Sequence, residues 1–115
     1  MSFEMLKQIA INALEEMKAL DVVEIDVTGK SSVTDCMIVA SGTSNRHVKS
    51  CADTVVEDVK KNGIVPISIE GREESQWVLV DLGDVVVHVF QEETRALYAI
   101  EDLWRIEREP SGDAE

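Results

Sequence analysis

The chain has 115 residues, of which 44% are hydrophobic and 30% are charged. It is therefore long enough for one globular domain with a single core and too apolar to be disordered. Its formal net charge of −12 argues against direct nucleic-acid recognition and against attraction to an anionic membrane, because both need clustered Lys and Arg.

The charge is unevenly distributed along the chain. Residues 70–115 carry 13 acidic and 4 basic side chains, whereas residues 1–69 carry 10 and 7. An acidic C-terminal half suits a basic protein partner and would raise the rate of encounter with it. The alternative interpretation is a solvated acidic surface that keeps the domain soluble.

The sequence predicts a cytoplasmic protein. No apolar run approaches the ~20 residues that span a bilayer, and the N-terminal segment carries Glu4, Glu15 and Glu16 within an amphipathic pattern, unlike a signal peptide. The two cysteines, Cys36 and Cys51, come without an export signal and indicate a reducing compartment.

The first elements are a helix and a strand. Apolar residues at helical spacing predict the helix: Leu6, Ile9, Ala10, Ala13, Leu14, Met17 and Leu20. Alternation of apolar and acidic residues over 23–27 then predicts a strand with one solvated face.

The middle of the chain predicts a strand–helix–strand unit. The apolar run 36–40 is typical of a strand covered on both faces, and a helix with an apolar stripe follows and ends at Asn62-Gly63. We expect the next strand, 64–70, to lie beside 36–40 as its parallel neighbour, because a helix separates the two. Pro66 favours an edge position for it.

Two β-branched runs, 77–82 and 85–90, flank Gly83-Asp84 and predict a tight hairpin. A closing helix begins at Glu92, and the apolar pattern ends after Trp104. The element order is α-β-β-α-β-β-β-α. It indicates one α/β domain over residues 1–105, with a mixed five-stranded sheet and about three helices, followed by an acidic tail at 106–115.

Metal and nucleophile patterns are weak. His47 and Cys51 lie four apart on a helix, and Cys36 and His88 could complete a zinc set. However, no C-x-x-C or H-E-x-x-H spacing is present, so buried thiols and ordinary histidines are the favoured interpretation, without a metal. Cys51 also lacks a third group that would orient a neighbouring base.

A phosphotransfer interpretation is the alternative enzyme hypothesis. The turn Ser41-Gly42-Thr43-Ser44 precedes a helix and is similar to a phosphate-cradling turn of nucleotidyltransferases. Those enzymes place two acids two apart on the following strand, and 64–70 lacks such a pair. The pairs Glu24/Asp26 and Asp81/Asp84 could hold a divalent ion. Helix capping by Thr43 or Ser44 and solvated acids are favoured over a small metal-dependent nucleotidyltransferase.

The aromatic residues suggest a binding surface. Trp77 and Tyr98 lie in the acidic half, near Asp81 and Asp84, and large aromatics with charges at the rim are typical of protein-binding hot spots. The alternative is that Trp77 packs in the core.

Three segments in order resemble one family: DVTGKSSVTDCMIVASGTSNRHV (26–48), EGREESQWVLVDLGDVVVHVF (70–90) and TRALYAIEDLW (94–104). They are similar to the bacterial ribosomal silencing factors, RsfS, which are related to Iojap of plastids and mitochondria. The resemblance covers residues 4–104. It implies a nucleotidyltransferase-like fold without transferase residues, and hence no enzymatic activity and no cofactor.

The resemblance also implies a function. Members bind the large ribosomal subunit through ribosomal protein L-fourteen, block joining of the small subunit and so repress translation when nutrients are scarce; when free they form homodimers. Matching positions predict the partner-binding residues, namely Trp77, Asp81, Leu82 and Tyr98, with Glu70 and Asp84 as weaker candidates. Strand alternation places Trp77 and Asp81 on one face and Leu82 on the other.

The strands also bear on self-association. Three apolar strands need cover on both faces, and only three helices are predicted to supply it. We therefore expect exposed apolar surface, which usually marks an interface, and a homodimer in isolation.

Overall fold

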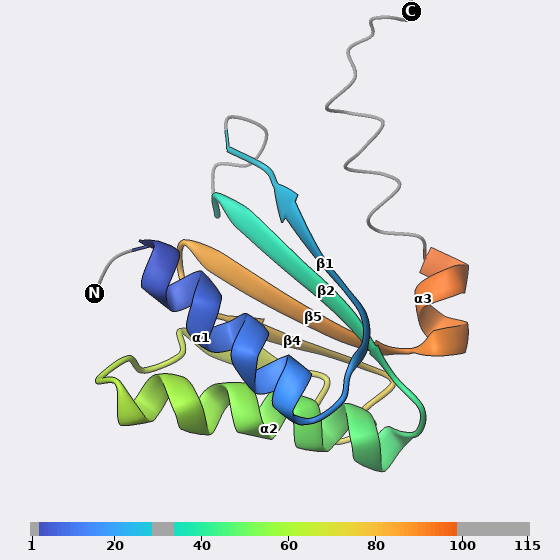
Figure 1. Ribbon diagram of the computed structural model, residues 1–115. Coiled ribbons are helices and arrows are strands. Elements are labelled where there is room, and N and C mark those ends of the chain that lie inside the picture. The colour runs from blue at the N-terminus through green and yellow to red at the C-terminus, as the bar shows by residue number, and fades with distance from the viewer. Residues whose placement is uncertain (1–2, 29–33, 99–115) are drawn as a thin grey trace, which may run out of the picture.

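The computed structural model describes residues 3–28 and 34–98. Its elements follow the predicted order (Figure 1). The helices and strands have these bounds: α1 Phe3–Glu16, β1 Leu20–Asp26, β2 Cys36–Gly42, α2 Asn45–Lys61, β3 Ser68–Glu70, β4 Trp77–Asp81, β5 Val85–Gln91 and α3 Glu92–Tyr98.

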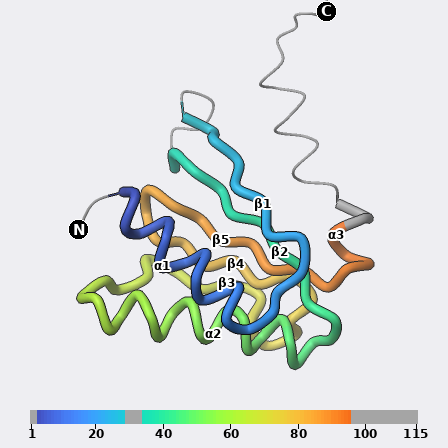
Figure 2. Tube along the Cα trace, in the orientation of Figure 1, coloured from blue at the N-terminus to red at the C-terminus, as the bar shows by residue number. Residues whose placement is uncertain are grey.

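The five strands form one mixed sheet in the order β1-β2-β5-β4-β3, and Figure 2 labels all of them. The β2–β5 pair is parallel, and the other three pairs are antiparallel. The predicted α/β class with a mixed five-stranded sheet is therefore confirmed. The likeness to nucleotidyltransferases stays a prediction.

One predicted pairing is wrong. The strand after α2 is not the neighbour of β2, because β5 and β4 lie between β2 and β3. The neighbour of β2 is instead β5, of which six of seven residues are buried, whereas β3 is short, with two of its three residues exposed. The central place goes to the more apolar strand because a central strand is covered on both faces. As predicted from Pro66, the segment 64–70 lies at an edge, with its strand limited to Ser68–Glu70.

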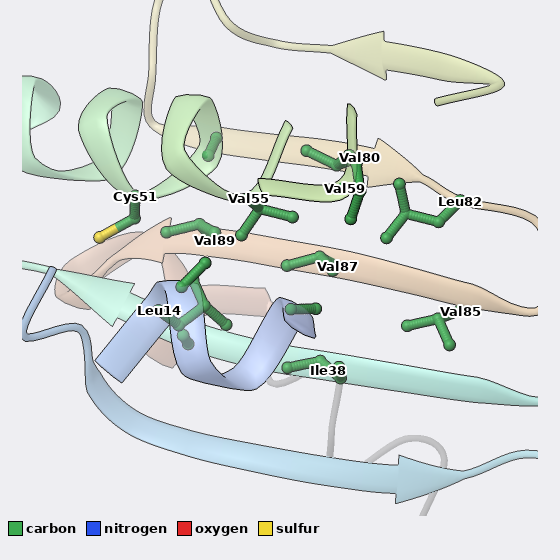
Figure 3. Close-up of a cluster of buried hydrophobic side chains, with 14 of the residues drawn as sticks. Leu14, Ile38, Cys51, Val55, Val59, Val80, Leu82, Val85, Val87 and Val89 are labelled. Carbon is green, nitrogen blue, oxygen red and sulfur yellow. The ribbon is translucent and has the colours of Figure 1, made fainter. Parts of the chain in front are cut away.

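Both long helices cover the same face of the sheet (Figure 1). The larger core lies between them and alternate residues of the strands, including Leu14 of α1, Val55 of α2 and Ile38 of β2 (Figure 3). A smaller cluster lies on the opposite face around Phe90, Val39 and Met37. The remaining strand side chains point to this opposite face, which carries no long helix.

The predicted ends of α2 are confirmed. Ser44 is its N-cap, and its hydroxyl accepts a hydrogen bond from the His47 backbone N–H at 3.1 Å. At the other end Gly63 adopts φ +83°, which favours glycine and lets the chain leave the helix.

The β4–β5 hairpin is also confirmed. Val85 accepts a hydrogen bond from the Leu82 N–H across the two-residue turn at 2.9 Å, and Gly83 adopts φ +97°. This turn fixes the register in which Trp77 lies opposite Phe90 and Leu79 opposite His88. The predicted boundary between a domain at 1–105 and a tail at 106–115 lies outside the described residues, so this division stays a prediction.

Candidate partner-binding surface

Strand β4 presents Trp77, Leu79 and Asp81 on the face that lacks α1 and α2. The intervening residues Val78 and Val80 belong to the helix-side core and are fully buried. The three outward residues are only half-buried. They form a short row of aromatic, aliphatic and acidic side chains, which is the chemistry of a protein contact.

Trp77 is held by two neighbours on β5. Its ring stacks on Phe90 with 4.8 Å between centroids, and its Nε1–H donates to His88 Nδ1 at 3.0 Å. Phe90 is fully buried. One side of the Trp77 ring therefore packs in a small core, and the residue as a whole is half-buried. The core interpretation and the surface interpretation of Trp77 each hold in part. A pre-positioned aromatic loses little conformational freedom when a partner packs on it.

His88 is a buried, neutral support for Trp77. It is 5% exposed, and burial lowers its pKa to about 4, because the imidazolium cannot be solvated there. Since Nδ1 accepts from Trp77, the ring proton lies on Nε2. His88 thus fixes the orientation of the indole.

Asp81 ends β4 and caps the hairpin. Its Oδ1 accepts a hydrogen bond from the Gly83 N–H at 2.9 Å. Asp84, in the turn itself, is exposed, and its carbonyl accepts hydrogen bonds from the N–H groups of Asp35 and Cys36 at 3.1 Å. These contacts fix the hairpin backbone against the start of β2, and the Asp81 carboxylate is held by the turn.

The other predicted surface residues are placed differently. Glu70, exposed at the end of β3, lies opposite Leu79 and so shares the face of Trp77 and Asp81. Leu82 is 7% exposed and points into the helix-side core (Figure 3). The structure therefore brings together Trp77, Asp81 and Glu70, and it does not bring Leu82 to them. The side chain of Tyr98, at the end of α3, lies outside the described residues.

Arg95 anchors the helix that ends at Tyr98. Its Nη1 donates to the Asp21 carbonyl at 2.8 Å and to the Ser41 hydroxyl at 2.9 Å. The guanidinium thus connects α3 to the start of β1 and the end of β2. Sequence reasoning missed this residue, because no local pattern pairs position 95 with positions 21 and 41.

Sequence reasoning considered His88 only as a metal ligand and did not assign Phe90 a role. A signal was present: a two-residue turn at Gly83-Asp84 already places Phe90 opposite Trp77. Counting back from the turn would have identified both supports of the indole.

The suggested zinc set is not assembled. Cys36 and Cys51 lie in the helix-side core, whereas His88 points to the other face. Burial raises the pKa of each thiol to about 11, so both are protonated at neutral pH and poor ligands or nucleophiles. His47 accepts from the Thr43 N–H at 2.9 Å and donates to the Met17 carbonyl at 2.8 Å. Among the described residues, no group of three or more His, Cys, Asp or Glu could hold a metal.

The turn before α2 uses its donors internally. The Thr43 N–H donates to His47 Nδ1, and the His47 N–H donates to Ser44 Oγ. Gly42 is required because a Cβ there would lie 2.7 Å from Val48 Cγ2. The favoured capping interpretation is thus confirmed for Ser44, and two N–H groups of this segment, those of Thr43 and His47, are already bonded within the turn.

The acidic pair of β1 is likewise engaged locally. Glu24 forms an ion pair with Lys7 of α1, and this hydrogen bond raises the pKa of Lys7. Asp26 Oδ1 accepts from the Thr28 N–H at 2.9 Å.

No described helix is both long and apolar enough to cross a bilayer.

Comparison with known proteins identifies close relatives. A family model described as "Ribosomal silencing factor during starvation" matches residues 1–115. The ribosomal silencing factor RsfS of Haemophilus influenzae is 40% identical over 99 residues, covering 86% of this chain and 97% of the relative. A crystal structure of a protein from Chromobacterium violaceum has a TM-score of 0.89 and 44% identity, and the match covers 90% of this chain and 87% of that one.

A more distant relative comes from Mus musculus. It is named "Mitochondrial assembly of ribosomal large subunit protein 1" and is 31% identical over 99 residues, which cover 84% of this chain and 43% of the relative.

The burial of His88 predicts a pH-dependent stability. The unfolded chain binds a proton at His88 below about pH 6.5, whereas the folded chain does not until about pH 4. Stability is therefore lost as pH falls through this window, by about 2 kcal/mol at about pH 5 relative to pH 7. Urea unfolding at both pH values measures the loss, and His88→Gln is the control because it cannot titrate. An equal pH dependence in the two proteins would contradict the assignment.

Proposed function

The chain belongs to the ribosomal silencing factor family, and on that premise we propose that it binds the large ribosomal subunit and sterically blocks joining of the small subunit. Family membership supports a ribosome-silencing role. The proposal adds the contact protein, ribosomal protein L-fourteen, and the condition, nutrient limitation. The site of action is then the cytoplasm, where the subunits meet.

The observation that carries the proposal is the sheet face around Trp77 that α1 and α2 do not cover. It offers a pre-positioned indole on the same face as two carboxylates, Asp81 at the far end of the same strand and Glu70 on the next strand. Proteins that contact ribosomal RNA are rich in Lys and Arg, which neutralise phosphates. An acidic rim around an aromatic anchor complements such a protein.

Occlusion requires no turnover. A bound domain that covers part of the subunit interface prevents joining by excluded volume, so its effect depends on occupancy alone. The internal hydrogen bonds of the turn before α2 do not favour the alternative, a metal-dependent nucleotidyltransferase. A magnesium-dependent nucleotide-binding assay separates the two functions.

We also propose that the free protein is a homodimer. The partly exposed Trp77 and Leu79 lie on the sheet face that α1 and α2 leave uncovered. Exposed apolar groups of this kind are common at interfaces. The dimer and ribosome interfaces need not be the same surface.

The direct test of the proposed function is sedimentation with separated ribosomal subunits. We expect the purified protein to sediment with large subunits and not with small ones, and to lower the yield of joined ribosomes without added nucleotide. Unchanged joining at saturating occupancy of the large subunit would contradict occlusion. Silencing that depended on ATP or GTP hydrolysis by this chain would do the same.

The acidic rim predicts charge-dependent binding. Asp81→Asn keeps an acceptor for the Gly83 N–H and removes the charge, whereas Asp81→Lys reverses it. We expect association with large subunits to slow, by roughly tenfold for the Lys variant, with a changed salt dependence. Trp77→Ala is less informative because it also removes the stack on Phe90.

The matched control for this charge series is Glu57→Lys, which makes the same change at an exposed position on α2. Kinetics of large-subunit binding and thermal melting are measured for all three variants. The assignment of Asp81 fails if Glu57→Lys slows binding as much as Asp81→Lys does.

The oligomeric state has its own test. Light scattering at tens of micromolar protein is expected to give twice the mass of one chain, because burial of exposed apolar side chains favours association. A monomeric mass under these conditions would count against the homodimer, and it would leave the ribosome proposal untouched.

A further inference from the structure

The edge of the sheet at β3 is unusually apolar for an outer strand. Alternate residues of this segment are exposed: Val65 is 76% exposed, Ile67 69% and Ile69 40%. They make up three of the four large hydrophobic side chains that are exposed among the described residues. On its inner side the segment pairs with β4, and β3 is the last strand of the sheet. An edge strand presents backbone N–H and C=O groups that can pair with another strand.

The charges beside this edge are acidic. A depression of about 580 Å³ at the end of β3 is lined by Ile69 and Gly71 together with Glu70, Arg72, Glu73 and Glu74. The one cation there is already engaged, since Arg72 donates to both carboxylate oxygens of Asp53 at 2.7 and 2.9 Å. The three glutamates make this depression acidic, and Arg46 and Lys49 line a neighbouring depression together with Glu73 and Glu74.

We propose that the β3 edge, residues 65–70, receives an extended segment of a basic protein, which adds a strand to the sheet. Its apolar side chains would pack on Val65, Ile67 and Ile69, and its Lys or Arg would face Glu70, Glu73 and Glu74. This is strand addition, in which backbone hydrogen bonds give affinity and alternate side chains give specificity. The proposal rests on the proposed function and names the recognition mode of the large-subunit protein.

The negative charge of this chain distinguishes between the possible binding partners of the β3 edge. Residues 64–84 contain five acids and one base, and the whole chain carries −12. A second copy paired edge to edge would bring like charges together, which opposes association. RNA is disfavoured for the same reason. A basic, extended protein segment meets both the apolar row and the acidic depression.

Only part of this edge shares the face of Trp77, because Ile69 lies opposite Val80 and so points to the helix-side face. Ser68 of β3 lies opposite Asp81, and Glu70 lies opposite Leu79. A strand added to β3 would therefore be one strand away from the row on β4. Pro66 and the three-residue length of β3 limit how many backbone bonds can form, so the side-chain contacts must supply much of the affinity.

The test uses Ile67→Lys, which removes apolar surface and adds a charge that repels a basic segment. Because Ile67 is mostly exposed, the melting temperature is expected to stay unchanged while binding to purified large subunits weakens at least about tenfold. Met5→Lys is the matched control: it makes the same change at another exposed residue, on α1. Equal binding by Ile67→Lys and wild type would overturn the inference.

A second measurement detects the added strand itself. Hydrogen exchange of the chain bound to large subunits is expected to show protection of amides in 65–70 relative to the free chain. If the wild type binds but these amides are not protected, strand addition is overturned and the proposed function stands. If the wild type does not bind, the proposed function itself fails, and the inference with it.

The remaining outcome concerns a second copy. Light scattering of Ile67→Lys beside the wild type is expected to give the same mass, since like charges oppose pairing of two β3 edges. If instead the variant loses self-association and keeps its affinity for large subunits, the edge is a dimer contact and the inference is wrong.

Discussion

The parallel pairing of β2 with β5 is the constraint on which the rest of the structure depends. All seven residues of β2 and six of the seven in β5 are buried, so this pair must be covered on both faces. On one face α1 and α2 supply the cover. On the other face the side chains of Met37, Val39 and Phe90 pack with Ile25 and Val27 and against Trp77. Since β5 continues directly into α3 and is joined to β4 through the tight turn at Gly83-Asp84, the position of β5 also determines where those elements lie.

The exposed indole follows from that constraint. The turn at Gly83-Asp84 sets the β4–β5 register, and the register places Trp77 over Phe90 and beside His88. A slip of one residue would turn Trp77 into the helix-side core and bring Val78 to the other face. The candidate surface is therefore not a loop that can vary freely. It is the outer side of the small core, which explains how a residue can serve both packing and recognition.

The sequence correctly predicted the features that depend on residues close together in the chain. Helical spacing identified α1 and α2, the cap and stop of α2 lay at Ser44 and Asn62-Gly63, and glycine in a two-residue turn identified the hairpin. The neighbour of β2 was missed because pairing across the sheet depends on the competition between β3 and β5 for the central place, which no window of sequence contains. The set of Trp77, Asp81 and Leu82 was taken from a family resemblance. Strand alternation already separates Leu82 from the other two, and the structure confirms that separation. The role of Arg95 depends on contacts between elements distant in sequence, whereas that of His88 follows from the register of the hairpin.

The net charge constrains how such a chain can act on a ribosome. A protein of charge −12 is repelled by exposed RNA. At physiological salt, dissolved ions screen both repulsion and attraction between charges beyond about 8 Å. Favourable contact is therefore confined to places where a basic protein reaches the subunit surface, and everywhere else the acidic surface works against binding. In the proposed function, specificity would arise as much from this repulsion as from the fit around Trp77 and the β3 edge. One mode of binding would be enough to block joining by the proposed occlusion, and additional sites on RNA would only dilute it.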